Sequence, residues 1–257
     1  MTFKIFNTSV GTPVHHRRNV CIIQPGYLPW LGYFDLVSRA DVFVLYDDVQ
    51  FDSGSWRNRN RILGSGGPVW LTVPVFRTKH FGQLIKDVRI ADSHWQEKHL
   101  RSIRHSYSRA PYFESFFPAI NFYLTQRRYD WLIDLNLAGH EIMSKLIGLP
   151  VNIKLSSSIR YAGKSRTARL VSICSELGAT RYIACDSSAN YMEPELWEEA
   201  NISLTYQHYP HPVYKQWNNP FVGYLSALDA LMFCGKTCAS YLGFGHERIR
   251  TGISNPL

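Results

Sequence analysis

Short apolar runs alternate with helical patterns over much of the chain. "VCIIQ" (residues 20–24) and "DVFVLY" (41–46) are apolar without alternation, which is typical of strands buried on both faces of a parallel sheet. Between them, "WLGYFDLVSRA" (30–40) spaces its apolar residues as one face of a helix. These three segments predict a strand, helix, strand unit.

The second half of the chain repeats this alternation. We predict strands in "VNIKLSS" (151–157), "TRYIAC" (180–185) and "SLTYQHY" (203–209), and helices over 165–178, 193–202 and 224–235. Strands that alternate with helices favour an α/β fold with a mainly parallel, Rossmann-like sheet.

The segment from about residue 52 to 128 departs from that pattern. It begins with a polar, Arg/Asn-rich stretch and a Gly-rich break, continues with a predicted strand at 69–75, and then becomes helical over 93–110 and 111–125. A further helix is predicted over 129–148. We therefore expect a single domain over 19–245 with an inserted strand and helical region after the second strand, a flexible leader at 1–18 and a C-terminal tail at 246–257.

Composition limits the class of protein. An apolar fraction of 45% with 14% aromatic residues indicates a globular chain. Five scattered cysteines fit neither a disulfide framework nor a zinc ribbon, so we expect a reducing compartment. The first twenty residues lack the apolar core of a secretory signal, and no run is long enough to span a membrane. We expect a cytoplasmic protein.

The formal net charge of +8 predicts attraction to phosphate groups. A nucleic acid, a nucleotide-linked substrate and an acidic membrane surface all fit this sign. The basic residues are dispersed in several short groups, so several local anion contacts are as well supported as one continuous footprint.

Polar side chains follow the predicted strands at their carboxyl ends, where open parallel sheets bind ligands. The candidates for this shared crevice are Gln24, Tyr27, Asp47, Asp48, Gln50, Ser187 and Asn190. Turn residues gather at strand ends in any protein, so each group taken alone also fits plain turn chemistry.

Two kinds of side chain are candidates for catalysis. The Asp47–Asp48 pair follows a buried strand, and its carboxylates suit a Mg²⁺ or Mn²⁺ ion that bridges to substrate phosphates. A turn or a helix cap is the alternative for this pair. His211 lies among aromatic residues and prolines and suits acid–base chemistry.

Arginines alternate with asparagines in "WRNRNRI". In an extended segment Arg57, Arg59 and Arg61 project from one face, with Asn58 and Asn60 on the other. Arginine forks bind phosphate or carboxylate in a bidentate way, so this face predicts an anion site; a solvated edge strand is the alternative.

A second basic group lies in "GKSRTARL". Lys164 and Arg166 stand at the start of a predicted helix, whose free N–H groups and dipole already favour an anion. The spacing of a P-loop is absent, as are the motifs of serine hydrolases, zinc proteases and dinucleotide-binding domains.

Several motifs in order give the chain a family resemblance. "IIQPGYLPWLGYFDLVSRADVFVLYDDVQF", "WRNRNRI", "WLTVPV", "APYF", "HPVYKQ" and "LSALDALMFCG" together resemble the WbqC-like protein family over residues 20–240. Within these motifs Tyr33, Asn58, Tyr214 and Gln216 are further candidates for substrate binding. The resemblance implies a setting in the assembly of bacterial surface polysaccharide, because this family is often associated with such gene clusters.

A fold-level resemblance points to nucleotidylyltransferases. In that fold an H-x-G-H motif at the start of the first helix binds ATP phosphates, and here Trp30 and Tyr33 stand in place of the two histidines. The resemblance therefore implies the nucleotidylyltransferase-like form of the sheet and an anion site at the helix start, rather than adenylation.

These observations lead to one expected function and two alternatives. We expect a transferase that acts on a nucleotide-linked or amino sugar precursor of O-antigen-type polysaccharide, by acyl or aminoacyl transfer from an activated donor. A glycosyl or nucleotidyl transferase dependent on Mg²⁺ or Mn²⁺ is the first alternative. The second is an RNA-binding protein that recognises tRNA.

Overall fold

The computed structural model describes residues 17–76, 82–92, 94–126, 128–217 and 220–243. The predicted tail lies outside these ranges, and so does the predicted leader apart from its last two residues. Within these ranges, no helix combines the length and apolar character needed to cross a membrane. The predicted division into leader, domain and tail stays a prediction.

Five parallel strands form the central sheet. They are β1 (Asn19–Ile23), β2 (Val42–Leu45), β5 (Ile153–Leu155), β6 (Arg181–Ala184) and β7 (Ser203–Tyr206). Their order across the sheet is β5-β2-β1-β6-β7, and each neighbouring pair is parallel. The chain thus starts in the middle, fills one side and then the other, as in Rossmann-type sheets. The predicted α/β class is confirmed, and its nucleotidylyltransferase-like form stays a prediction.

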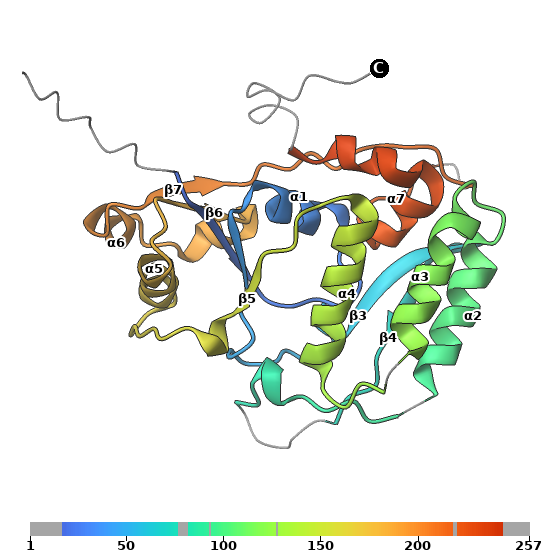
Figure 1. The fold of residues 1–257 in the computed structure, drawn as a ribbon, viewed down its shortest axis with the longest axis horizontal. Coiled ribbons are helices and arrows are strands. Elements are labelled where there is room, and N and C mark those ends of the chain that lie inside the picture. Colours follow the sequence, from blue (N-terminus) through green and yellow to red (C-terminus); the bar gives the residue numbers. More distant parts are fainter. Residues whose placement is uncertain (1–16, 77–81, 93, 127, 218–219, 244–257) are drawn as a thin grey trace, which may run out of the picture.

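Helices cover both faces of this sheet, which explains the unbroken apolar runs (Figure 1). On β1, Val20 and Ile22 pack with α5 (Arg166–Glu176) and α6 (Pro194–Glu199). Cys21 points to the other face, in the cluster that contains the buried side chains of α1 (Leu31–Arg39) and α7 (Ala227–Cys234).

An antiparallel hairpin and three helices separate β2 from β5. The strands of the hairpin are β3 (Arg59–Gly64) and β4 (Gly67–Thr72). The helices are α2 (Trp95–Tyr107), α3 (Phe113–Thr125) and α4 (Leu132–Ile147). Short 3₁₀ turns complete the chain, namely η1 (Ile85–Asp87), η2 (Ser156–Ser158), η3 (Asp186–Tyr191) and η4 (Gly235–Tyr241).

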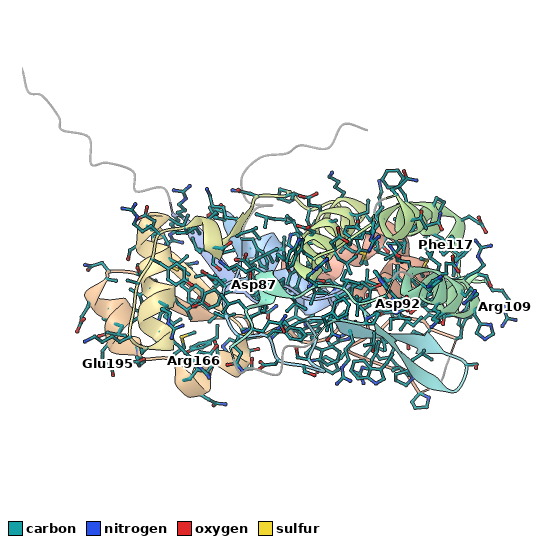
Figure 2. All side chains as sticks on the ribbon, turned by 90° about the horizontal axis from the view of Figure 1, so that it is seen from below. Asp87, Asp92, Arg109, Phe117, Arg166 and Glu195 are labelled. Carbon is teal, nitrogen blue, oxygen red and sulfur yellow. The ribbon has the colours of Figure 1, made fainter. Side chains whose placement is uncertain are left out.

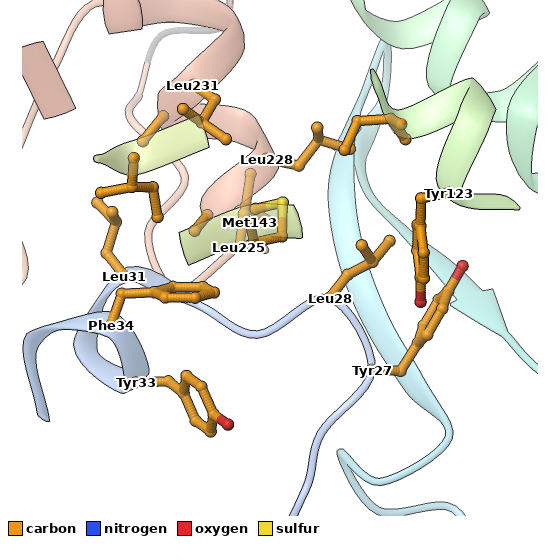
Figure 3. Packing of buried hydrophobic residues seen from close by; sticks show 14 of the residues in the cluster. Tyr27, Leu28, Leu31, Tyr33, Phe34, Tyr123, Met143, Leu225, Leu228 and Leu231 are labelled. Carbon is orange, nitrogen blue, oxygen red and sulfur yellow. The ribbon is translucent and has the colours of Figure 1, made fainter. Parts of the chain in front are cut away.

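One apolar core joins the hairpin region to the sheet. Figure 3 shows Leu28, from the loop after β1, near Leu228 of α7 and Met143 of α4. Main-chain bonds add to this core, because the Ser226 amide donates to the Arg61 carbonyl of β3 at 2.8 Å. The hairpin is therefore held beside the carboxyl end of β1, where it forms a wall of the pocket described next.

Candidate functional site

A pocket of about 530 Å³ opens at the carboxyl ends of β1 and β6. These two strands are neighbours at the point where the strand order reverses, since the chain moves from β1 to β2 and β5 on one side and to β6 and β7 on the other. Ligands of open α/β sheets bind at this point. The volume is that of a site for a small molecule.

The described lining of this pocket contains cations and aromatic rings and no carboxylate. The cationic and aromatic residues are Arg57, Arg61, Trp30, Tyr33, Trp56 and Tyr224. The polar residues are Gln24, Asn60, Cys185, Ser187 and Gln207. A cationic wall without acidic residues favours an anionic ligand.

Arg57 is a half-buried cation at this wall. Burial lowers the pKa of its guanidinium, and the negative charge of Asp52 offsets part of this effect. The Arg57 Nε atom is shielded from solvent and has no hydrogen-bond partner in the described structure. An N–H donor left in this state is unfavourable without a ligand, so Arg57 is poised to bind one.

The alternation predicted for the Arg/Asn segment is observed. Asn58 and Asn60 are buried, whereas Arg57, Arg59 and Arg61 are partly exposed on the other face. The Asn60 side-chain amide donates to the Tyr27 and Leu28 carbonyls at 3.2 and 2.7 Å. These bonds fix the arginine-bearing strand to the loop that follows β1.

The Asn58 amide donates to the Val73 carbonyl at 2.9 Å and thereby joins the two arms of the hairpin. Asn58 does not line the pocket. Its predicted role in substrate binding stays a prediction, while its observed contacts are those of a structural residue.

Trp30 also lines the pocket, and the position of its indole depends on a glycine. Its indole lies across Gly32, so closely that a Cβ atom at residue 32 would approach three indole carbons to within 2.6 Å. The same ring stacks on His211, with centroids 6.0 Å apart and planes at 8°. Any side chain at residue 32 would displace the Trp30 indole from the pocket.

His211 lies behind Trp30 and Tyr224, outside the pocket lining. Its Nε2 accepts a hydrogen bond from the Tyr224 amide at 3.0 Å, and its Nδ1 donates to the Pro212 carbonyl at 2.8 Å. Burial lowers the pKa of the imidazole, which favours its neutral form. The main chain thus engages both ring nitrogens, and the acid–base role stays a prediction.

Tyr224 is held in an uncommon backbone conformation. Its φ is 58°, in the left-handed region, and its side chain is 57% exposed. The Arg61 guanidinium donates to its carbonyl at 3.3 Å, and His211 accepts from its amide. These contacts keep the Tyr224 ring at the mouth of the pocket against the cost of the strained backbone.

Asp47 and Asp48 lie away from the pocket lining, at the carboxyl end of β2. The buried Asp47 carboxylate accepts from the Ser157 amide at 2.9 Å, the Ser157 hydroxyl at 2.7 Å and the Ser156 hydroxyl at 3.0 Å. Asp48 also contacts the Ser156 hydroxyl. Serines of η2 therefore satisfy the carboxylate that was a candidate metal ligand.

No group of three or more His, Cys, Asp or Glu side chains lies close enough to bind a metal in the part of the chain that the structure describes. Gln50 is exposed beside Leu84. The structure thus does not bring Asp47, Asp48 and Gln50 to the pocket that Gln24 lines, because η2 anchors the aspartates beside β5. Their catalytic and binding roles stay predictions.

Two of the three candidate tyrosines, Tyr27 and Tyr33, are buried and bonded to histidines. The Tyr27 hydroxyl lies 2.9 Å from His99 Nδ1, away from the pocket, and burial lowers the pKa of His99 to about 4. The Tyr33 hydroxyl lies 2.7 Å from His140 Nδ1, although Tyr33 also lines the pocket. Burial also lowers the pKa of His140, to about 3, so both histidines are neutral partners at physiological pH.

The basic group at the start of α5 is exposed and separate from the pocket lining. Ser165 caps the helix by accepting from the Ala168 amide at 3.1 Å. The Arg166 guanidinium lies 5.4 Å from the Tyr191 ring centroid, and Lys164 is exposed. In Figure 2, Arg166 and Arg109 lie toward opposite ends of the molecule, which shows how widely the basic charge is spread.

The turn η3 after β6 contributes to the pocket only in part. Ser187 lines it and lies 3.4 Å from Cys185 Sγ, measured from its hydroxyl oxygen. Asn190, from the same turn, is exposed and does not line the pocket. Its binding role stays a prediction.

Tyr214 and Gln216 belong to a buried network around Asp229. Both donate to one Asp229 oxygen, at 2.8 and 2.7 Å, and the Tyr107 hydroxyl donates to the other at 2.8 Å. Burial raises the pKa of Asp229 to about 6, against the effect of these bonds. The two residues predicted to bind substrate thus fix the loop before α7 to that helix, and Tyr107 joins the same carboxylate to α2.

Sequence reasoning missed several residues that shape the site. Trp56, Asn60, Cys185, Gln207 and Tyr224 line the pocket, and their positions depend on contacts between distant segments. Gln207, for example, donates to the Gly32 carbonyl of α1 at 2.5 Å. One signal was available for Asp229, which is an isolated carboxylate in the apolar stretch "ALDALMFC".

Comparison with known proteins gives a consistent result. The model of the WbqC-like protein family matches residues 24–241. An uncharacterized protein of Mycobacterium tuberculosis, Rv1507c, is 32% identical over 231 residues, which cover 88% of this chain and 98% of that protein. No solved structure matches the chain.

Proposed function

Because the chain belongs to the WbqC-like protein family, we propose that it is a transferase for a phosphate-bearing sugar precursor of bacterial surface polysaccharide. The substrate occupies the pocket at the ends of β1 and β6. The family resemblance supports the polysaccharide setting, and the chemistry of the pocket supports the phosphate.

One observation carries the proposal, namely the pair of arginines at a pocket wall that has no carboxylate among its described lining residues. Neither Arg57 nor Arg61 forms an ion pair within the described ranges, and the Nε atom of each is shielded and without a partner. Guanidinium groups bind phosphate through two parallel N–H bonds, and partial burial strengthens this interaction.

The polar residues of the same pocket suit the sugar. Gln24 has a shielded amide oxygen without a hydrogen-bond partner in the described structure, and Ser187 presents a hydroxyl. Amide and hydroxyl groups are the partners that sugar hydroxyls or an acylamino group require. Acyl or aminoacyl transfer to an amino sugar would then occur near Cys185 and Ser187, with the phosphate held by the arginines.

Metal-dependent glycosyl or nucleotidyl transfer is less well supported, because serines bind the Asp47 and Asp48 carboxylates. The RNA-binding alternative has one observation in its favour. Helix α2 exposes Lys98, Arg101 and His105, which give one face a basic character. Binding of tRNA should then weaken steeply with salt; an affinity that is flat from 50 to 200 mM salt, about the range over which phosphate contacts are screened, would exclude it.

Isothermal titration calorimetry with uridine, thymidine and guanosine diphosphate sugars tests the proposal. We expect one series to bind, and Arg57→Gln to weaken that binding about tenfold to a hundredfold, as for a lost charge-assisted hydrogen bond. Arg89→Gln is the matched control, since this exposed arginine also lies near a tryptophan, 5.5 Å from the Trp131 centroid, but outside the pocket.

Two results would contradict the proposed function. The first is the absence of binding by every phosphate-bearing sugar, including sugar 1-phosphates. The second is equal affinity of the wild-type and Arg57→Gln proteins for the sugar that binds.

A further inference from the structure

Two exposed tryptophans lie side by side at the rim of the pocket. Trp56 is 45% exposed and Trp70 is 44% exposed, and their ring centroids are 5.3 Å apart with planes at 34°. Trp56 lines the pocket, whereas Trp70, on β4, lies next to Trp56 but outside the pocket lining. Exposed aromatic clusters next to a pocket are typical of a binding surface.

Arginine side chains lie close to both indole rings. The Arg59 guanidinium lies 4.3 Å from the Trp70 centroid, and the Arg61 guanidinium lies 5.6 Å from both centroids. Cation–π contacts of this kind hold the arginines at the edge of the pocket. In the described structure the Nε atoms of Arg59 and Arg61 are shielded from solvent and have no hydrogen-bond partner, so partly exposed indole rings lie beside guanidinium groups whose donors are not all satisfied.

From this arrangement we propose that the substrate is a nucleoside diphosphate sugar whose base stacks on the Trp56–Trp70 surface. The inference rests on the proposed function and adds the identity of the group linked to the phosphate. The base lies outside the pocket, the diphosphate lies along Arg61 and Arg57, and the sugar enters the pocket.

The order of groups on the protein carries this inference. Trp70 lies beside Trp56, and Arg61 lies near both rings and also lines the pocket with Arg57. The protein therefore presents first the stacking surface, then the arginines and then the polar pocket. This is the order of the base, the diphosphate and the sugar in a nucleoside diphosphate sugar. A sugar 1-phosphate would need only the cations and the pocket, and the exposed Trp70 ring would have no role.

The charge of the surface also favours a nucleotide over a neutral saccharide. Aromatic side chains flanked by arginines bind bases by stacking while the cations contact the adjacent phosphates. A nucleoside diphosphate brings both partners in one molecule.

Titration calorimetry with three matched probes tests this arrangement. The probes are a nucleoside diphosphate sugar, the free nucleoside diphosphate and the sugar 1-phosphate, in the uridine, thymidine and guanosine series. We expect Trp70→Ala to weaken the first two about tenfold, as for the loss of one base-stacking contact, and to leave the sugar 1-phosphate unchanged.

Two further variants separate loss of stacking from damage to the fold. Trp70→Phe keeps an aromatic face and should retain the affinity to within about threefold. Trp131→Ala removes a tryptophan that is 40% exposed and has an arginine 5.5 Å from its centroid, but lies outside the pocket; it should leave all three probes unchanged.

Each outcome decides between the two proposals. If a nucleoside diphosphate sugar binds Trp70→Ala as tightly as the wild type, the stacking inference is overturned and the proposed function stands. If only the sugar 1-phosphate binds, the nucleotide is excluded and the phosphate-bearing sugar is retained. If no probe binds, the proposed function itself is overturned.

Discussion

Two polar clusters at the carboxyl edge of the same sheet differ in how their charged groups are satisfied. Beyond β2, three hydrogen bonds from Ser156 and Ser157 satisfy the buried Asp47 carboxylate. Beyond β1, Arg57 faces a pocket with its Nε atom unpaired in the described structure. Polar residues at the carboxyl edge of the sheet therefore form a structural anchor in one place and a candidate binding site in the other.

The difference gives a physical criterion for assigning function. A buried charge that is fully hydrogen-bonded stabilises the fold, and any ligand would have to compete with those bonds. A partly buried charge without a partner destabilises the empty protein slightly and favours a ligand of opposite charge. Removing each charge should therefore have opposite consequences for stability and binding.

Loss of the Asp47 carboxylate should have the largest effect on stability. Asp47→Ala leaves the Ser157 amide and hydroxyl without their acceptor, whereas the Ser156 hydroxyl keeps Asp48 as a partner, and we expect the free energy of unfolding to fall by about 3 kcal/mol. Urea denaturation followed by circular dichroism measures this change. The exposed Asp87 provides the control, since Asp87→Ala should lie within about 0.5 kcal/mol of the wild type.

An Asp47→Ala protein as stable as the wild type would show that the serine contacts do not anchor the sheet edge. The difference in role between the Asp47 cluster and the Arg57 cluster would then have no support from stability. If the destabilised Asp47→Ala protein keeps its affinity for the sugar ligand, Asp47 contributes to stability and not to binding.

The Asp229 network predicts a dependence of stability on pH. Its carboxyl pKa is raised to about 6 from 3.8, so the folded protein binds this proton more tightly than the unfolded chain. The resulting stabilisation is complete below pH 3.8 and is lost as the pH rises through about 6, at up to about 1.4 kcal/mol per pH unit.

Denaturation at several pH values between 4 and 7, about the window in which the Asp229 proton is lost, tests this prediction. Asp229→Asn cannot titrate, and it should remove that part of the slope. An unchanged slope in the variant would assign the pH dependence to other groups. This network resembles the Asp47 cluster, because Tyr107, Tyr214 and Gln216 satisfy the carboxylate without an open pocket.

Arg57→Gln should have the smallest effect on stability. Because the guanidinium is partly desolvated and has no ion-pair partner in the described ranges, we expect the free energy of unfolding to stay within about 0.5 kcal/mol of the wild-type value. The same variant should lose ligand affinity, as proposed above. A loss of stability near that of Asp47→Ala would make Arg57 a structural residue.

Local patterns of the sequence predicted the elements of the fold and one wall of the site. Apolar runs without alternation identified β1 and β2, since helices cover both faces of the sheet. The alternation of arginine and asparagine placed Arg59 and Arg61 on one face of β3, with Arg57 on the same side just before the strand. Both signals depend only on neighbouring residues and on the geometry of a strand.

Contacts between distant segments decided the rest of the site. Nothing near Asp47 in sequence shows that its carboxylate accepts hydrogen bonds from serines 109 and 110 residues away. Likewise, Tyr27 turns toward His99, and Tyr224 reaches the pocket through bonds to Arg61 and His211. Such pairings depend on the tertiary fold, which the local pattern does not specify.

The most direct test follows the side chains of both clusters in one NMR titration with the nucleoside diphosphate sugars. We predict that the Nε–H resonances of Arg57 and Arg61 shift as the ligand saturates, because these donors gain phosphate oxygens. The Ser157 amide, which already donates to Asp47, and the Nε–H of Arg89 should not move. Shifts centred on Ser157 with unchanged arginine signals would show that the ligand binds beyond β2 and not at the arginines.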